Sequence, residues 1–145
     1  MGDIVCATRG GEGSRVVQET AIVRAKEVDA PLVFLYVADP MSLDDEIDSG
    51  LKTAVSAELH WMGETLLRIA QTRADAMFLP SQVKIREGRV QDEIIRYLRE
   101  NSTDLLMLGA PRGTTANVFG DDKIEILAEA IQQATNVTVE IVRPD

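Results

Sequence analysis

Residues 104–124 read DLLMLGAPRGTTANVFGDDKI, and the order of residue types in this stretch decides the fold. The apolar run LLML at 105–108 is bounded by polar and turn residues, a pattern typical of a strand that is buried on both faces of a parallel sheet. A loop containing Gly109, Gly113 and Gly120 follows. From Asp121 a helix is expected, because apolar residues then recur at helical spacing: Ile124, Leu127, Ala128, Ile131 and Ala134.

A strand, a glycine-rich loop and a helix N-terminus in this order direct unpaired backbone amides and the helix dipole at one point, which favours an anion there. Glycines also allow the backbone to approach a phosphate closely. The same residues equally suit a tight strand-to-helix connection that holds no ligand. The spacing within this stretch leaves both interpretations open.

Outside this stretch the chain alternates between strand and helix patterns. Further strands are expected at residues 3–8, 32–37, 82–87 and 137–142, and further helices from Ser14 to about residue 28, at 51–73 and at 90–100. This alternation predicts an α/β fold of three layers, in which an open, parallel, five-stranded sheet has helices on both faces. The alternating polar strands at 82–87 and 137–142 suit the sheet edges, which gives the order 3-2-1-4-5 in a single domain over residues 1–145.

Local patterns add two expectations about the helices. Ser14 is expected to be the N-cap of the first helix, because its hydroxyl can accept a hydrogen bond from an early helical amide. The first helix and the helix at 51–73 are each expected to bury one apolar face. Their predicted inward residues are Val17, Ala21, Ala25 and Val28 in the first, and Val55, Leu59, Met62, Leu66, Ile69 and Ala70 in the second.

The predicted strand order places the first and fourth strands side by side, at the point where the winding of the chain reverses. Ligands of open α/β sheets bind beyond the carboxyl ends of the strands at such a switch point. The two glycine-rich loops, at residues 9–13 and 109–120, follow these two strands. Topology and loop composition therefore both favour a binding site there.

Composition excludes several classes of function. The chain has 145 residues, a formal net charge of −9 and no stripe of Lys or Arg, which argues against binding to nucleic acids or anionic membrane surfaces. No apolar run approaches the roughly 18 residues of a membrane span. The N-terminus enters the first strand directly, without the pattern of a signal peptide, so a cytoplasmic protein is expected.

The residue types that carry chemistry are sparse, and no catalytic or metal-binding residue is predicted. Cys6 lies within the first expected strand and is expected to be a buried apolar residue. His60, the single histidine, has no metal-ligand partner at a suitable spacing. The acidic residues at 39–48 do not match an EF-hand, because a loop that begins at Asp44 would need glycine at Ser49 and glutamate at Val55.

Three segments carry a resemblance to a known family: DIVCATRGGEGSRVVQETA at 3–21, LVFLYV at 32–37 and EGRVQDEIIRYLRENSTDLLMLGAPRG at 87–113. With them the chain resembles the universal stress protein family over nearly its whole length. The resemblance implies an adenine nucleotide alpha hydrolase-like fold, a homodimer formed through the last strand, and ATP or AMP as the ligand of many members. It also leaves room for a protein partner in a regulatory role.

The resemblance further implies a phosphate motif: a glycine, two residues, a second glycine, nine residues, and a glycine followed by Ser or Thr. Here Gly109 matches the first position, Gly113 follows with one extra residue, and Gly120 comes after six residues instead of nine. Asp121 stands where the hydroxyl residue is expected. The nucleotide-binding residues expected at the switch point are Thr8, Arg9, Val37, Leu108, Gly109, Arg112, Gly113, Gly120 and Asp121.

The departures from the motif have a physical meaning. Ionised Asp121 cannot donate to a phosphate, and its charge repels a triphosphate at close range. Arg9 stands where nucleotide-binding relatives usually have aspartate, and it could join Arg112 in holding a different anion. Two hypotheses follow from the resemblance, a regulatory stress-response module with a degraded nucleotide loop and a genuine ATP or AMP binder with altered loops.

A third hypothesis is an enzyme. The stretch RGGEGS at 9–14 is similar to the SGGxDS loop of ATP pyrophosphatases but lacks its first serine and its aspartate. No nucleophile paired with a base is visible in the sequence. A regulatory role is therefore favoured over catalysis.

Overall fold

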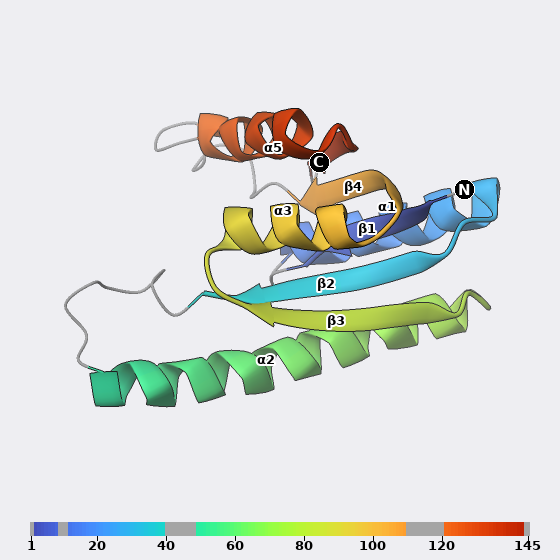
Figure 1. Ribbon diagram of the computed structural model, residues 1–145. Coiled ribbons are helices and arrows are strands. Elements are labelled where there is room, and N and C mark those ends of the chain that lie inside the picture. Colours follow the sequence, from blue (N-terminus) through green and yellow to red (C-terminus); the bar gives the residue numbers. More distant parts are fainter. Residues whose placement is uncertain (1, 9–11, 40–48, 110–120, 144–145) are drawn as a thin grey trace.

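The computed structural model describes residues 2–8, 12–39, 49–109 and 121–143. Strands and helices alternate along these residues (Figure 1). Their bounds are β1 (Asp3–Ala7), α1 (Glu12–Val28), β2 (Leu32–Ala38), α2 (Ser49–Ala76), β3 (Ser81–Glu87), α3 (Val90–Glu100), β4 (Thr103–Gly109), α5 (Asp121–Thr135) and β5 (Thr138–Val142).

The strands form one parallel sheet in the order β3-β2-β1-β4-β5. Residue Ile4 of β1 lies opposite Leu32 of β2 and Leu105 of β4, so the first strand of the chain is the centre of the sheet. The five strands, their order and the helices on both faces confirm the fold predicted from the sequence. β3 and β5 are the edges, as their alternating polar pattern indicates.

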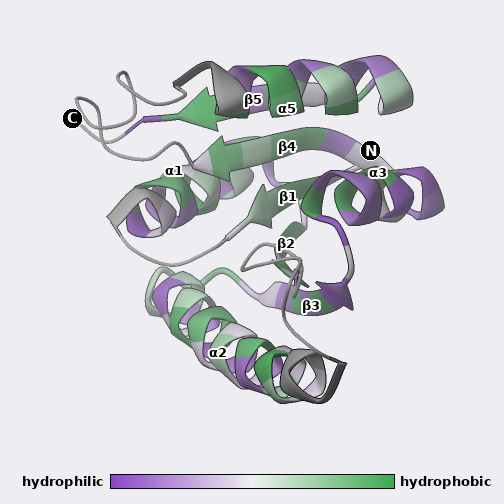
Figure 2. Ribbon diagram, turned by 90° about the vertical axis from the view of Figure 1, so that its left-hand side faces the viewer, coloured by the Kyte–Doolittle hydropathy of each residue, from purple (hydrophilic) through white to green (hydrophobic). Residues whose placement is uncertain are grey.

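Each face of the sheet has its own apolar core, and side chains alternate between the two faces along every strand. The face under α1 and α2 holds Phe34 and Met107, and the face under α3 and α5 holds Leu35 and Leu106, all of them at most 1% exposed. In Figure 2 the hydrophobic colour is prominent on β1 and β4, in the middle of the sheet, whereas each helix carries both colours. Among the described residues, no helix is both long and apolar enough to cross a membrane.

The long helix α2 is rotated relative to the sequence prediction. Met62 and Ile69 were expected to face inward, but they are 46% and 43% exposed, so this part of the prediction is wrong. Ala70 is fully buried as predicted, and the rest of the buried row runs through Gly63, Leu67 and Ala74, which the prediction did not include. Small residues let α2 approach β2 closely along this row, and the larger Met62 and Ile69 therefore lie on its flank.

The ends of α1 also differ from the prediction. The helix begins at Glu12, so Ser14 lies inside its first turn and is not the N-cap. Val28 is the last helical residue and is 49% exposed, whereas Val17, Ala21 and Ala25 are fully buried as predicted. The chain turns with φ of 54° at Asp29, and Ala30 enters the core in place of Val28.

Candidate functional site

The switch point lies where β1 and β4 end side by side, with Ala7 opposite Leu108. From there the chain leads from β1 to α1 on one face and from β4 to α5 on the other. Both helices therefore begin at the carboxyl edge of the sheet, and their N-termini face the region beyond the two strands (Figure 1). The two strand ends and the two helix N-termini therefore meet at the switch point that the strand order predicts, and a ligand there stays a prediction.

Thr8 follows β1 directly and is 2% exposed. Its amide donates to the Leu35 carbonyl at 2.9 Å, which extends the pairing with β2 by one residue. Its hydroxyl oxygen accepts a hydrogen bond from Gln18 Nε2 of α1 at 2.6 Å. The Thr8 side chain is thus committed to the α1 side of the sheet, where it orients a buried glutamine.

The other described site residues lie along the carboxyl edge but differ in what they offer. Leu108 is 4% exposed and belongs to the core under α3 and α5, and the half-buried Val37 packs against the same core. Gly109 is half-buried and lies opposite Val142 of β5. The side chains of Leu108 and Val37 therefore form an apolar surface on the face of the sheet under α3 and α5, whereas the Thr8 side chain lies on the α1 face.

The structure does not describe the side chains of the remaining predicted site residues. Arg9, Arg112, Gly113 and Gly120 lie outside the described residues. Asp121 is the first residue of α5, and its side chain is likewise outside the description. Their grouping around a ligand stays a prediction.

A buried polar chain that the sequence analysis missed connects the switch point to α2. Gln18 is 2% exposed, donates to Thr8 and accepts a hydrogen bond from Arg73 NH1 at 2.6 Å. The signal was available, because Gln18 lies between Val17 and Ala21 and one turn before Ile22 on the inward side of α1. A glutamine among inward positions needs hydrogen-bond partners, and here both ends of its amide have one.

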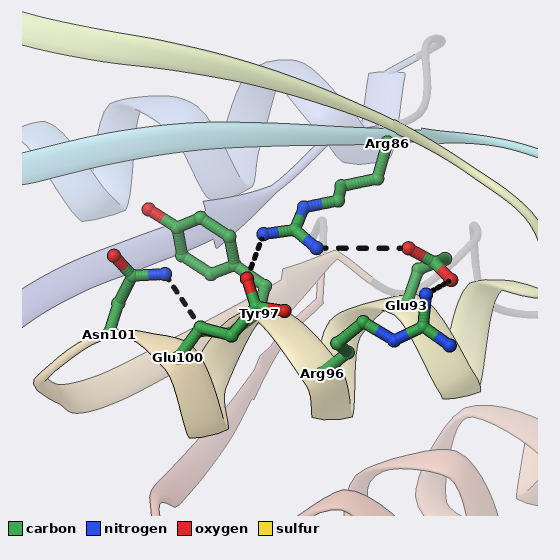
Figure 3. Close-up of polar contacts among 6 residues, drawn as sticks. All are labelled: Arg86, Glu93, Arg96, Tyr97, Glu100 and Asn101. Carbon is green, nitrogen blue, oxygen red and sulfur yellow. Dashed lines mark hydrogen bonds and ion pairs between the residues drawn. The ribbon is translucent and has the colours of Figure 1, made fainter.

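A second polar cluster joins edge strand β3 to α3 (Figure 3). Arg86 NH2 lies 2.7 Å from Glu100, Arg86 NH1 lies 3.9 Å from Glu93, and the guanidinium carbon lies 5.3 Å from the centre of the Tyr97 ring. Glu93, whose side chain is only 9% exposed, also pairs with Arg96 at 3.0 Å. These contacts hold the edge strand β3 against α3.

Gly88 makes the turn between β3 and α3, and the cluster depends on it. Its φ of 143° is a conformation that residues with a side chain rarely adopt. A Cβ at this position would lie 3.0 Å from Glu93 Cγ. Glycine is therefore required both by the backbone and by the packing of Glu93 over the turn.

Two places in the described residues hold side-chain types that are used in catalysis. Cys6 is fully buried, and desolvation raises the pKa of its thiol far above the ordinary value, which keeps the thiol protonated. Glu87 accepts a hydrogen bond from Ser56 and lies 3.6 Å from His60 Nε2. In this trio the Ser56 hydroxyl donates to the carboxylate of Glu87 rather than to an imidazole, which is not the order of contacts in a catalytic triad.

Metal binding has no support in the part of the chain that the structure describes. Within those residues, no three His, Cys, Asp or Glu side chains come together in a group that could hold a metal ion. At the described part of the switch point, the strand ends are lined by the apolar side chains of Leu108 and Val37 on one face of the sheet and by Thr8 on the other.

Comparison with known proteins identifies relatives of this fold. The model of the universal stress protein family matches residues 1–143. A search of curated proteins finds no significant match. Among solved structures, the chain is similar to the universal stress protein UspA from Lactobacillus plantarum, with 18% identity, a TM-score of 0.78 and coverage of 97% of each chain.

Two other similar structures contain nucleotides. A universal stress protein family protein from Arabidopsis thaliana with AMP bound shares 14% identity at a TM-score of 0.61, over 99% of this chain and 92% of that one. The universal stress protein from Archaeoglobus fulgidus in complex with dAMP shares 13% identity at a TM-score of 0.61, over 97% of each chain. At these identities the similarity establishes a shared fold.

Proposed function

Because the chain belongs to the universal stress protein family, we propose that it is a small regulatory module of the stress response, with a degraded triphosphate site and a homodimeric state. A catalytic role is not proposed. The described groups at the switch point offer binding surfaces rather than a nucleophile and its base.

One observation carries the proposal. α5 begins at Asp121, at the carboxyl edge of the sheet, and its first two residues are Asp121 and Asp122. A helix N-terminus attracts an anion through its free amides and its dipole, and carboxylates within the first turn already supply that negative charge. A triphosphate bound near this helix N-terminus would add its charge to that of two acidic residues in the first turn. Reduced affinity for ATP is the expected consequence.

A second candidate is binding of an adenine mononucleotide at the same switch point. The solved relatives with AMP and dAMP support it, since they share the sheet and its topology. A monophosphate carries fewer charges than ATP and would be repelled less by Asp121 and Asp122. The region beyond Thr8, Val37 and Gly109 is where such a ligand would lie.

The deciding experiment begins with the purified protein as isolated. Any small molecule released on denaturation is identified by chromatography and mass spectrometry, and ATP-Mg and AMP are then titrated by calorimetry. We expect no co-purified ATP and weak or undetectable binding of ATP-Mg. Co-purified ATP, or micromolar affinity for it, would show that the altered loop still holds a triphosphate.

The substitution Asp121→Ser tests the role of charge at the helix N-terminus. We expect it to strengthen ATP binding by about tenfold, because it removes one repulsive charge and restores a hydroxyl donor. Asp75→Ser on exposed α2 is the matched control, since it changes the net charge equally at a distance from the switch point. Equal affinities for wild type and Asp121→Ser would refute the electrostatic explanation.

Homodimerisation through β5 is the other part of the proposal. β5 is an edge of the sheet. The Val139 amide donates to the Gln132 side chain at 3.2 Å, which shows that this amide points away from β4. Amides along a strand alternate in direction, so the Ile141 amide also points outward and can pair with a second copy. Of these two outward amides, that of Val139 is already hydrogen-bonded within the chain.

Light scattering at micromolar concentration tests this interface. Wild type is expected to be a dimer. Ile141→Pro, which removes the outward amide at a sheet edge where proline is tolerated, is expected to be a monomer. Ile141→Thr keeps the amide and shortens the side chain, so it should remain a dimer. A monomeric wild type would exclude the interface, and loss of the dimer in both variants would assign it to the side chain.

A further inference from the structure

A groove of about 380 Å³ lies between α1 and the C-terminal part of α2, away from the polar turn between β3 and α3. Its lining consists of Glu19, Ile22, Val23, Arg73, Ala76 and Met77. This volume falls at the lower end of the roughly 300–1,000 Å³ of small-molecule pockets. Four of the six lining residues are apolar, as is typical of such pockets.

The apolar side of the groove is open to a ligand. Val23 and Met77 are 47% and 45% exposed, although both are large hydrophobic residues, and Ile22 forms a buried floor. Lys26 Nζ donates to the Met77 carbonyl at 2.8 Å and so ties α1 to the end of α2. The two helices that form the walls are therefore held together beside the groove.

The polar side of the groove contains one half-buried cation. Arg73 donates to Gln18, a neutral group, and has no carboxylate partner among the described residues. The acid that shares the groove, Glu19, is paired with Arg15 at 2.9 Å. In a chain of net charge −9, an arginine that lies beside an apolar surface and has no anionic partner in the described part of the chain is a complementary site for a bound anion.

The guanidinium is also held in position. Thr8 accepts a hydrogen bond from Gln18 Nε2, which fixes the glutamine amide and presents its Oε1 to Arg73. Both Thr8 and Gln18 are 2% exposed, so this support is rigid. A group that is already oriented loses less conformational entropy when a ligand binds.

We propose that this groove binds a small aliphatic carboxylate, with the carboxylate on Arg73 and the hydrocarbon chain against Ile22, Val23 and Met77. A single negative charge matches a single guanidinium, whereas a phosphate dianion would be repelled more strongly by Glu19 and by the negative net charge. This site is distinct from the switch point. It requires neither a nucleotide nor a dimer.

Decanoate is the probe, titrated below its micellar concentration into the full-length protein and followed by calorimetry and amide chemical shifts. We expect saturable binding, with shifts centred on α1 and the end of α2. Decanol and acetate, which each keep one half of the ligand, should bind at least about tenfold more weakly. No saturable binding of decanoate, or equal binding of decanol, would overturn the proposal.

Two variants with different defects locate the site. Arg73→Met removes the cation, and Val23→Phe fills the apolar side while leaving Arg73 in place; each should weaken decanoate at least about tenfold. Arg68→Met, an exposed position on the same helix, should bind as wild type does. If Arg73→Met does not fold, Val23→Phe decides alone. Undiminished binding to Val23→Phe, or a change in its oligomeric state that shows a second copy in the groove, would overturn the proposal.

Discussion

Gly63→Val is expected to lower the free energy of unfolding by about 3 kcal/mol, the largest single effect that we predict. A Cβ at position 63 would lie 2.6 Å from Tyr36 Cε1 and closer still to Cδ1. The Tyr36 ring belongs to β2 and is 5% exposed, so it cannot move aside. α2 would have to lift from the sheet, and the contacts of Leu67 and Ala70 with the core would loosen with it.

Chemical denaturation monitored by circular dichroism measures this effect. Ala57→Val, at an exposed position of the same helix, places the same branched side chain where it meets no ring and should cost about 0.5 kcal/mol. In a Tyr36→Val background the cost of Gly63→Val should shrink, since the opposing ring is absent. If Gly63→Val costs no more than Ala57→Val, the close approach of α2 to β2 does not govern the packing of this face.

Arg86→Met is the second large effect, with an expected loss of about 2 kcal/mol. The substitution removes the pairing with Glu100, the contact with Glu93 and the stacking on Tyr97. Glu93 keeps Arg96 as a partner, and the Arg86 side chain is 24% exposed, so the loss is smaller than for a fully buried pair. Arg15→Met breaks the exposed pair with Glu19 and should cost less than about 0.5 kcal/mol.

The pH dependence of the stability difference between wild type and Arg86→Met gives an independent check of the ion pair's contribution. The hydrogen bond from Arg86 lowers the pKa of Glu100 below its ordinary value of 4.5. A carboxylate with a lower pKa in the folded state stabilises the fold above its unfolded pKa, and this contribution disappears as pH falls through the folded pKa. The stability gap between wild type and Arg86→Met should therefore narrow below about pH 4.5. A gap that stays constant down to pH 3 would assign the effect to packing alone.

The fold was accessible from the sequence because its signals are local and strong. The run at 105–108 is continuous and apolar, and Leu105 to Leu108 are at most 8% exposed. Val139 and Ile141 alternate with polar residues and pack on the core under α5, as expected for an edge strand with one inward face. Such patterns depend on one strand and its two faces, and they identify elements reliably.

Apart from the two ends of α1, the errors concern properties that depend on two elements at once. The rotation of α2 follows from the contact of Gly63 with Tyr36, which no periodicity within residues 51–73 reveals. Similarly, Thr8 was correctly placed at the end of β1, but the direction of its hydroxyl depends on Gln18 of α1. The location of each strand and helix along the chain could be predicted from the sequence. The contacts between side chains of different elements could be seen only in the packed structure.

The central place of β1 has a consequence for biosynthesis. The first strand to be translated pairs on one side with β2, about 30 residues later, but its other partner is β4, so that Asp3 meets Thr103. At about 5–20 residues per second, the ribosome needs roughly 5–20 s to supply those intervening residues. During that interval a nascent chain can form only the β1–β2–β3 half, with the β4 side of its central strand unpaired. Chaperone binding and co-translational aggregation are therefore expected to centre on nascent chains in which β4 has not yet been synthesised.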